Sequence, residues 1–259
     1  MITSSQNPKI KLARALSGRA KERREAGGFV AEGVRLLEEA LETGWPFRFA
    51  LYADGLSERG MALLDRLVER KIVVEKVESR LLDSLGDTET SQGILAVLDH
   101  ALIPTPQSPD FVLIPDQIRD PGNLGTLLRT AAAAAVDAVF IPPETADPFA
   151  PKVVRAGMGA HFRLPVRALD WEEIRAQVGG LTVWLAEAEG ARPCWEADLR
   201  PPLALIVGGE AEGGSEHARA LKTSSISIPM PGKMESLNAA AAGAVLMFEV
   251  ARQRHSGQV

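Results

Sequence analysis

The sequence has little of what disulfides and metal sites require. It contains one cysteine, Cys194, and four histidines that lie far apart along the chain. A single cysteine cannot form an internal disulfide, and scattered histidines without paired cysteines do not make a zinc site, so we predict no metal. No apolar run approaches the roughly 20 residues that cross a bilayer, and the N-terminus lacks the apolar segment of a secretory signal. We therefore expect the protein in the cytoplasm.

Two common nucleotide-binding patterns are also missing. The chain has no G-x-G-x-x-G pattern after the first strand of either half, and no Walker lysine follows a glycine loop. These absences argue against a nucleotide-dependent oxidoreductase and against a methyltransferase of the ordinary Rossmann kind, because both need glycines in the first βα turn.

Basic residues are concentrated at the start of the chain, although the net charge is −5. Residues 1–35 contain eight lysines and arginines and three glutamates, a local balance of +5 that leaves −10 for the remainder. Dense positive charge on an acidic protein can steer a polyanion to one face, but a solvated helix explains the same pattern. The candidate polyanion-binding residues are Lys9, Lys11, Arg19, Lys21, Arg23 and Arg24.

The pattern of apolar residues predicts two α/β domains in these 259 residues. The first covers residues 1–100, with helices at 8–17 and 34–43 and strands at 47–53, 72–77 and 93–98. Residues 101–110 have three prolines and no period, so we interpret them as a linker. The second covers residues 111–259 and has a mostly parallel sheet, with strands at 111–115, 138–141, 181–186 and 203–207 and helices from about 124 to 135 and at 171–178.

The stretch at residues 225–254 organises the second domain. A strand pattern, SISI, is followed by a loop in which Pro229 and Pro231 fix the backbone, and then by a long alanine-rich helix. Such a rigid loop can hold a flat heterocycle through backbone contacts. We expect Ser236 to be the helix N-cap and Asn238 to lie in the first helical turn. Upstream, Gly208 and Gly209 follow a buried strand and let the backbone approach a ligand.

Three stretches of the second domain match one family in order: DQIRDPGNLGTLLRTAAAAAVDAVFIP, LALIVGGEAEGGS and IPMPGKMESLNAAAAGAV. They resemble the motifs of the SpoU/TrmH group of RNA ribose 2′-O-methyltransferases, which belong to the SPOUT class. FVAEGVRLLEEAL and TETSQGILAVL in the first domain resemble the substrate-binding domain that precedes the SpoU domain, a fold akin to small RNA-binding ribosomal proteins. The sequence departs from the family at Gly157, where serine is common, and at Gly214, where leucine is common.

The resemblance implies a trefoil knot, a homodimer and S-adenosylmethionine as cofactor, with the basic residues above binding RNA. The cofactor-binding residues it implies are Gly208, Gly209, Ile228, Met230 and Leu237. The catalytic residues it implies are Asn123, Arg129, Glu210, Ser236 and Asn238. The family role of Arg129 is to take the hydroxyl proton, but a guanidinium has five donors and no acceptor, so we interpret it as stabilising negative charge.

The sequence leaves the substrate open. We expect ribosomal RNA, with transfer RNA as the alternative, and neither the nucleotide nor a role in ribosome maturation or antibiotic resistance can be read from the chain. A non-catalytic RNA-binding protein on the same fold is a further alternative. It should have lost Asn123, Arg129 or Asn238, and all three are present. Trp171, Trp184 and Trp195 are interpreted as packing residues, because their spacing does not form a base-stacking array.

Overall fold

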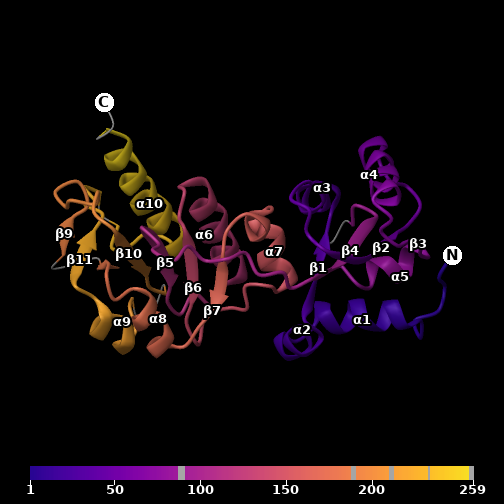
Figure 1. Ribbon diagram of the computed structural model, residues 1–259, viewed down its shortest axis with the longest axis horizontal. Helices are drawn as coiled ribbons and strands as arrows, with labels where there is room; N and C mark the ends of the chain where they lie inside the picture. Colours follow the sequence, from indigo (N-terminus) through magenta and orange to yellow (C-terminus); the bar gives the residue numbers. More distant parts are fainter. Residues whose placement is uncertain (87–90, 188–190, 210–212, 233, 257–259) are drawn as a thin grey trace. The chain divides into compact units, whose positions relative to one another are not determined.

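The computed structural model describes residues 1–86, 91–187, 191–209, 213–232 and 234–256. The chain divides into two compact units, each considered by itself below (Figure 1). Unit 1 contains Met1–Leu102 and Phe149–Phe162, and unit 2 contains Ile103–Pro148 and Arg163–Val259. No helix of the described residues is long and apolar enough to cross a membrane.

Unit 1 is a four-stranded sheet with helices. Its strands β1 (Gly28–Glu32), β4 (Ile94–Asp99), β2 (Phe47–Tyr52) and β3 (Val74–Lys76) lie in the order β1-β4-β2-β3. Its helices are α1 (Pro8–Ser17), α2 (Ala20–Ala26), α3 (Val34–Glu42), α4 (Glu58–Glu69), α5 (Ser79–Asp83) and α7 (Pro151–Gly157), with a 3-10 turn at Ala160–Phe162. Helix α1 begins where Asn7 Oδ1 accepts from the N–H of Lys9 and Pro8 takes the first position. Its apolar face, Ile10, Ala13 and Leu16, is buried in the core.

The division differs from the predicted boundaries at one segment. Residues 149–162 were predicted in the second domain, but they group with unit 1. The ring of Phe149 lies 5.1 Å from that of Phe29 on β1 and 4.4 Å from that of His100, measured between centroids. These aromatic contacts join the segment to β1, 120 residues earlier, and to His100 directly after β4.

Unit 2 is a seven-stranded sheet in which every described pairing is parallel. In spatial order its strands are β7 (Val166–Ala168), β6 (Ala138–Ile141), β5 (Phe111–Pro115), β10 (Leu203–Val207), β8 (Thr182–Ala186), β11 (Ser224–Ser227) and β9 (Arg192–Pro193). Its helices are α6 (Pro121–Ala133), α8 (Trp171–Gln177), α9 (Glu216–Leu221) and α10 (Ala239–Ser256). All residues of β5 and β10 are buried, which is the pattern of a sheet covered on both faces.

The two helix pairs of unit 2 cover opposite faces of the sheet. Val112, Ile114 and Ile206 point into a core closed by α8 and α9. The residues that alternate with these along each strand face α10, where the guanidinium of Arg254 lies over the ring of Phe111. Figure 1 shows α6 and α10 on one side of the strands and α8 and α9 on the other. The chain leaves β5 toward β6 and β7, then crosses to β8, so the strand order reverses between β5 and β10. In such sheets ligands bind at the carboxyl ends of the strands beside this reversal.

Candidate active site

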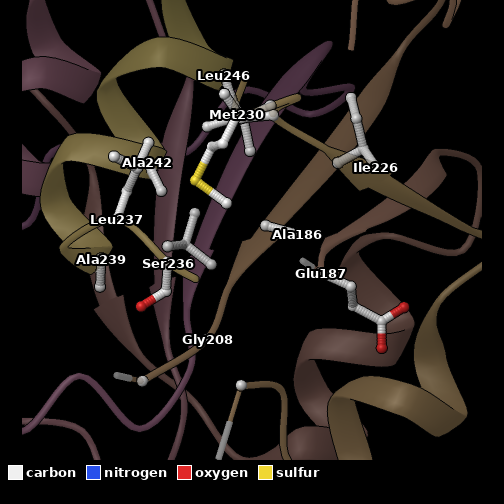
Figure 2. Close-up of a pocket in the computed structure, with 14 residues that line it drawn as sticks. Ala186, Glu187, Gly208, Ile226, Met230, Ser236, Leu237, Ala239, Ala242 and Leu246 are labelled. Carbon is white, nitrogen blue, oxygen red and sulfur yellow. The ribbon is translucent and has the colours of Figure 1, made fainter. Parts of the chain in front are cut away.

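A cavity of about 220 Å³ lies at the carboxyl ends of β8, β10 and β11, against helix α10 (Figure 2). Small residues of its wall, among them Gly208, Gly209, Ala239 and Ala242, leave room for an occupant. The remaining lining residues are Ala186, Glu187, Val207, Gly213, Ile226, Ile228, Met230, Ser236, Leu237 and Leu246. In Figure 2 the Met230 side chain projects between Ala242 of α10 and Ala186 of β8.

All of the residues predicted to hold the cofactor line this one cavity: Gly208, Gly209, Ile228, Met230 and Leu237. The sequence separates the two glycines from the other three by about twenty residues, and the parallel arrangement of β10 and β11 brings them together. Their role in binding remains a prediction.

The two glycines are required by close backbone approach. A Cβ on Gly208 would lie 2.3 Å from the carbonyl carbon of Gly213 and 2.6 Å from the nitrogen of Gly214. A Cβ on Gly209 would lie 2.7 Å from the carbonyl oxygen of Gln117. Real Cβ contacts of this length do not occur with backbone atoms, so any side chain here would displace the loop. Gly214 differs from these two, because a Cβ there would lie 2.8 Å from Leu185 Cδ1, the end of a side chain and not a backbone atom.

Asn238 connects the first and third motifs. Its Oδ1 accepts from the N–H groups of Ala240 at 3.0 Å and Ala241 at 3.2 Å, and its Nδ2 donates to Asn123 Oδ1 at 3.0 Å. Asn238 is therefore the N-cap of α10, and the prediction that Ser236 caps this helix was wrong. Ser236 instead lies exposed in the loop and lines the cavity.

Asn123 is fixed by a second cap, at the start of α6. Asp120 Oδ1 accepts from the N–H of Asn123 at 2.8 Å, so the helix begins at Pro121 and not near Leu124 as predicted. Arg129 follows on the exposed side of the same helix, and among the residues that the structure describes it has no hydrogen-bond or ion-pair partner. Glu210 lies outside the described residues.

Glu187 is a lining residue that sequence reasoning missed. Its Oε2 accepts from Lys222 Nζ at 2.6 Å and from the hydroxyl of Ser225. Burial by itself would raise the pKa of the Glu187 carboxyl, but the hydrogen bonds from Lys222 and Ser225 outweigh burial and lower it. A carboxylate at the end of a strand carries no local signature, and its partners follow it by 35 and 38 positions.

Of the six predicted RNA-binding residues of unit 1, four are exposed, and Lys9 and Arg23 make contacts within the unit. Lys11, Arg19, Lys21 and Arg24 are exposed. Lys9 forms an ion pair with Glu75. Arg23 is only 3% exposed, and its Nη1 donates to the carbonyl oxygens of Leu16 and Gly18, both at 2.8 Å. Arg23 therefore joins α1 to α2 and is not an exposed cation, which corrects its place among the candidates.

Residues 110–248 match the SpoU rRNA Methylase family, and residues 7–96 match the MRM3-like substrate binding domain. The chain belongs to the SpoU rRNA methylase family. It is 33% identical over 270 residues to the 23S rRNA (uridine(2479)-2′-O)-methyltransferase of Streptomyces viridochromogenes, covering 98% of this chain and 93% of that one. It is 32% identical over 255 residues to the 23S rRNA (guanosine(2553)-2′-O)-methyltransferase RlmP of Bacillus subtilis, with 96% and 98% covered.

Solved structures of this family have the same fold. An AdoMet-bound rRNA methyltransferase from Sinorhizobium meliloti superposes with a TM-score of 0.84 at 29% identity, covering 97% of both chains. The SpoU methyltransferase AviRb from Streptomyces viridochromogenes, in complex with AdoMet, superposes with a TM-score of 0.82 at 30% identity, covering 97% of this chain and 100% of that one. The α/β fold with a mostly parallel sheet and a preceding substrate-binding domain is therefore confirmed.

Proposed function

We propose that this protein is an RNA methyltransferase that uses S-adenosylmethionine to methylate a ribose 2′-hydroxyl of ribosomal RNA. One observation carries the proposal: the second and third motifs line a single cavity at the carboxyl edge of a parallel sheet, and Asn238 links this site to Asn123 of the first motif, 115 residues earlier. The named relatives act on ribosomal RNA, which favours that substrate over transfer RNA.

The cavity fits this cofactor chemically. Apolar side chains from Ile226, Ile228 and Leu246 suit a flat adenine ring, and the glycine cradle offers backbone groups where side chains cannot fit. The Glu187 carboxylate at the wall is paired with Lys222, so it provides a hydrogen-bond acceptor and not net negative charge. When bound, S-adenosylmethionine supplies an activated methyl group. The chain's own residues must then align the ribose and handle one proton.

Ribose placement falls to the link between the motifs. Asn123 and Asn238 fix each other's amide orientation, and Ser236 offers a hydroxyl at the cavity wall. Arg129 has no partner among the described residues, so its planar fork is available to a substrate phosphate and to negative charge developing on the 2′-oxygen. In our proposal a phosphate oxygen or water accepts the proton, because a guanidinium has no acceptor.

RNA binding and assembly are further parts of the proposal. Lys11, Arg19, Lys21 and Arg24 of unit 1 present exposed charge for the RNA backbone. Helix α10 exposes Val245 at 45% and Phe248 at 52%, and an apolar strip on one helix face is suited to a twofold homodimer. We also propose that the chain after β11 forms the trefoil knot implied by the family, and that the protein acts in the cytoplasm.

Calorimetry tests the cofactor proposal. We expect one S-adenosylmethionine site per chain, with S-adenosylhomocysteine competing for it. Gly208→Ala should abolish this binding, because its Cβ would displace the loop at Gly213. Gly180→Ala is a matched control, since a Cβ there meets no atom within 4 Å. If the wild-type protein binds neither compound, the methyltransferase proposal is wrong.

A further inference from the structure

Unit 2 has another cavity, of about 550 Å³, on the α8 and α9 face of the sheet edge. We call it the Asp116 cavity. It lies where β5 and β6 end and where α8 and α9 begin, and its principal lining residues are Asp116, Gln117, Glu144, Trp171, Arg175 and His217. None of them lines the cofactor cavity, and the function proposed above does not use them.

The wall of this cavity contains a buried carboxyl oxygen without a partner. Asp116 has an exposed fraction of 0%, and its Oδ2 accepts from the N–H of Ser215 at 2.6 Å. Its Oδ1 is also buried, and no described residue donates to it. An unsatisfied buried acceptor is costly, so this position favours a ligand that brings an N–H donor.

A flat aromatic surface faces the same space. The rings of Trp171 and His217 are nearly parallel, at 9°, with centroids 5.7 Å apart. The two rings stack on each other, and Trp171 also packs against the α8–α9 core, as predicted from the sequence. A planar heterocycle can extend such a stack. The volume lies within the range of small-molecule sites.

The charges of the cavity exclude a phosphate as its main ligand. Four described lining residues carry carboxyl groups and one carries a guanidinium: Asp116, Glu144, Asp170, Glu172 and Arg175. Glu144 is held in place by Gln117 Nε2, which donates to it at 3.2 Å, and by Arg119 at 3.4 Å. A ligand here should present donors and a flat ring, and keep its own negative charge outside.

The cavity is next to the cofactor cavity. The carbonyl oxygen of Gln117, in the loop after β5, would lie 2.7 Å from a Cβ on Gly209, in the loop after β10. Gln117 lines the Asp116 cavity and Gly209 lines the cofactor cavity, so these two loops form a shared wall. The backbone of Gln117 has φ +54°, a conformation that a non-glycine residue adopts only when its surroundings impose it.

We infer that the Asp116 cavity binds a nucleobase of the substrate RNA close to the methylated ribose, with a base N–H on Asp116 Oδ1 and the ring stacked on Trp171. This inference rests on the proposed RNA substrate. It adds a base-recognition site that selects the nucleotide sequence around the target, whereas the cofactor cavity and the Asn123–Asn238 link recognise groups common to every nucleotide.

Fluorine NMR on protein labelled with 5-fluorotryptophan tests the inference directly. The chain has four tryptophans, and Trp171→Phe identifies the resonance of Trp171. The titration uses guanosine monophosphate with S-adenosylhomocysteine present, so that the cofactor cavity is occupied. We expect the Trp171 resonance to shift, and the resonance of exposed Trp195 to remain as an internal control. Asp116→Asn should weaken this binding about fivefold or more, because an amide N–H then opposes the donor of the base.

Three results would overturn the inference. The first is a Trp171 resonance that does not shift at any nucleotide concentration up to the solubility limit. The second is an equal shift with ribose 5-phosphate, which would indicate a phosphate site. The third is a shift of the Trp171 resonance with arginine amide and none with the nucleotide, which would indicate a site for a protein cation. Calorimetry with S-adenosylhomocysteine on the same variants separates this outcome from failure of the proposed function, since Trp171→Phe should leave that affinity unchanged.

Discussion

Asn238 has two roles that substitution can separate. Its Oδ1 caps α10, and its Nδ2 donates to Asn123. Serine caps helices as well as asparagine does, but its hydroxyl is too short to reach Asn123 and it has no amide. Alanine provides neither interaction. We therefore expect Asn238→Ser to be nearly as stable as wild type and Asn238→Ala to be measurably less stable, while both lose methyl transfer.

The magnitudes follow from the contacts. Loss of an N-cap costs about 1 kcal/mol. The side-chain bond to Asn123 is exposed, so its net value lies at the lower end of about 0.5–1.5 kcal/mol. Asn238→Ser should thus unfold within about 0.5 kcal/mol of wild type and Asn238→Ala about 1.5 kcal/mol below it, or roughly 3–6 °C in Tm for a unit of this size. Denaturation gives the stabilities, and single-turnover methylation of a ribosomal RNA fragment gives the rates.

Asn123→Ala completes the test as a matched variant. It removes the link and leaves the cap of α10 intact, so its stability should equal that of Asn238→Ser. Combining the two should cost no more than either alone, because both remove the same bond. If Asn238→Ser unfolds as readily as Asn238→Ala, the carbonyl oxygen is not the cap. If Asn238→Ser or Asn123→Ala methylates RNA at the wild-type rate, the link between the motifs has no part in catalysis.

Three other predictions concern single charged residues. Arg129→Lys and Arg129→Ala should both be nearly inactive from about pH 6 to 10, because neither has the planar guanidinium, and both should keep their affinity for the cofactor. A lysine variant whose single-turnover rate climbs toward wild type at high pH would show instead that this residue takes the proton. Arg23→Ala should lower the free energy of unfolding by about 1–3 kcal/mol, because it loses the hydrogen bonds to Leu16 and Gly18. Replacement of the exposed Arg24 by alanine should leave stability unchanged and should lower both the affinity for RNA and its salt dependence. If urea denaturation shows the same loss of stability for both variants, this assignment is wrong. Burial raises the pKa of Asp116, so ionisation of its carboxyl costs the folded state free energy. Wild type should therefore lose stability relative to Asp116→Asn as the pH rises above the ordinary aspartate pKa of about 3.9, and denaturation curves of the two that stay parallel across this range would refute this expectation.

The periodic parts of the chain could be predicted from the sequence. Helix α1 at Pro8–Ser17 and strands β5, β6 and β10 have the predicted bounds, because an amphipathic helix and a buried strand each require a recognisable pattern of apolar residues. The ends of helices were less certain. In the stretch SLN both Ser236 and Asn238 are good N-caps by type, and which of them caps α10 depends on the position of Asn123, 115 residues away.

Burial of single polar residues could not be predicted, because it depends on the packing of other elements. Arg23 has the same neighbours in sequence as the exposed Lys21 and Arg24, but it faces the end of α1, whose carbonyl groups it satisfies. Trp184 was predicted to be a packing residue, and its exposed fraction of 5% confirms this. The same prediction for Trp195 was wrong, since 57% of it is exposed. Period and residue type do not distinguish these cases.

The two groups missed at the sheet edge, Glu187 and Asp116, have a common cause. Each lies just after the carboxyl end of a parallel strand, and each is held by a residue that flanks α9: Glu187 by Lys222, and Asp116 by the N–H of Ser215, 99 positions later. In a parallel sheet successive strands are joined through helices, so residues that meet at this edge are necessarily distant in the chain. The family motifs located the cofactor side of the edge because they are contiguous runs. The opposite side is built from four short segments, namely the loops after β5 and β6 and the starts of α8 and α9, and only the fold brings them together.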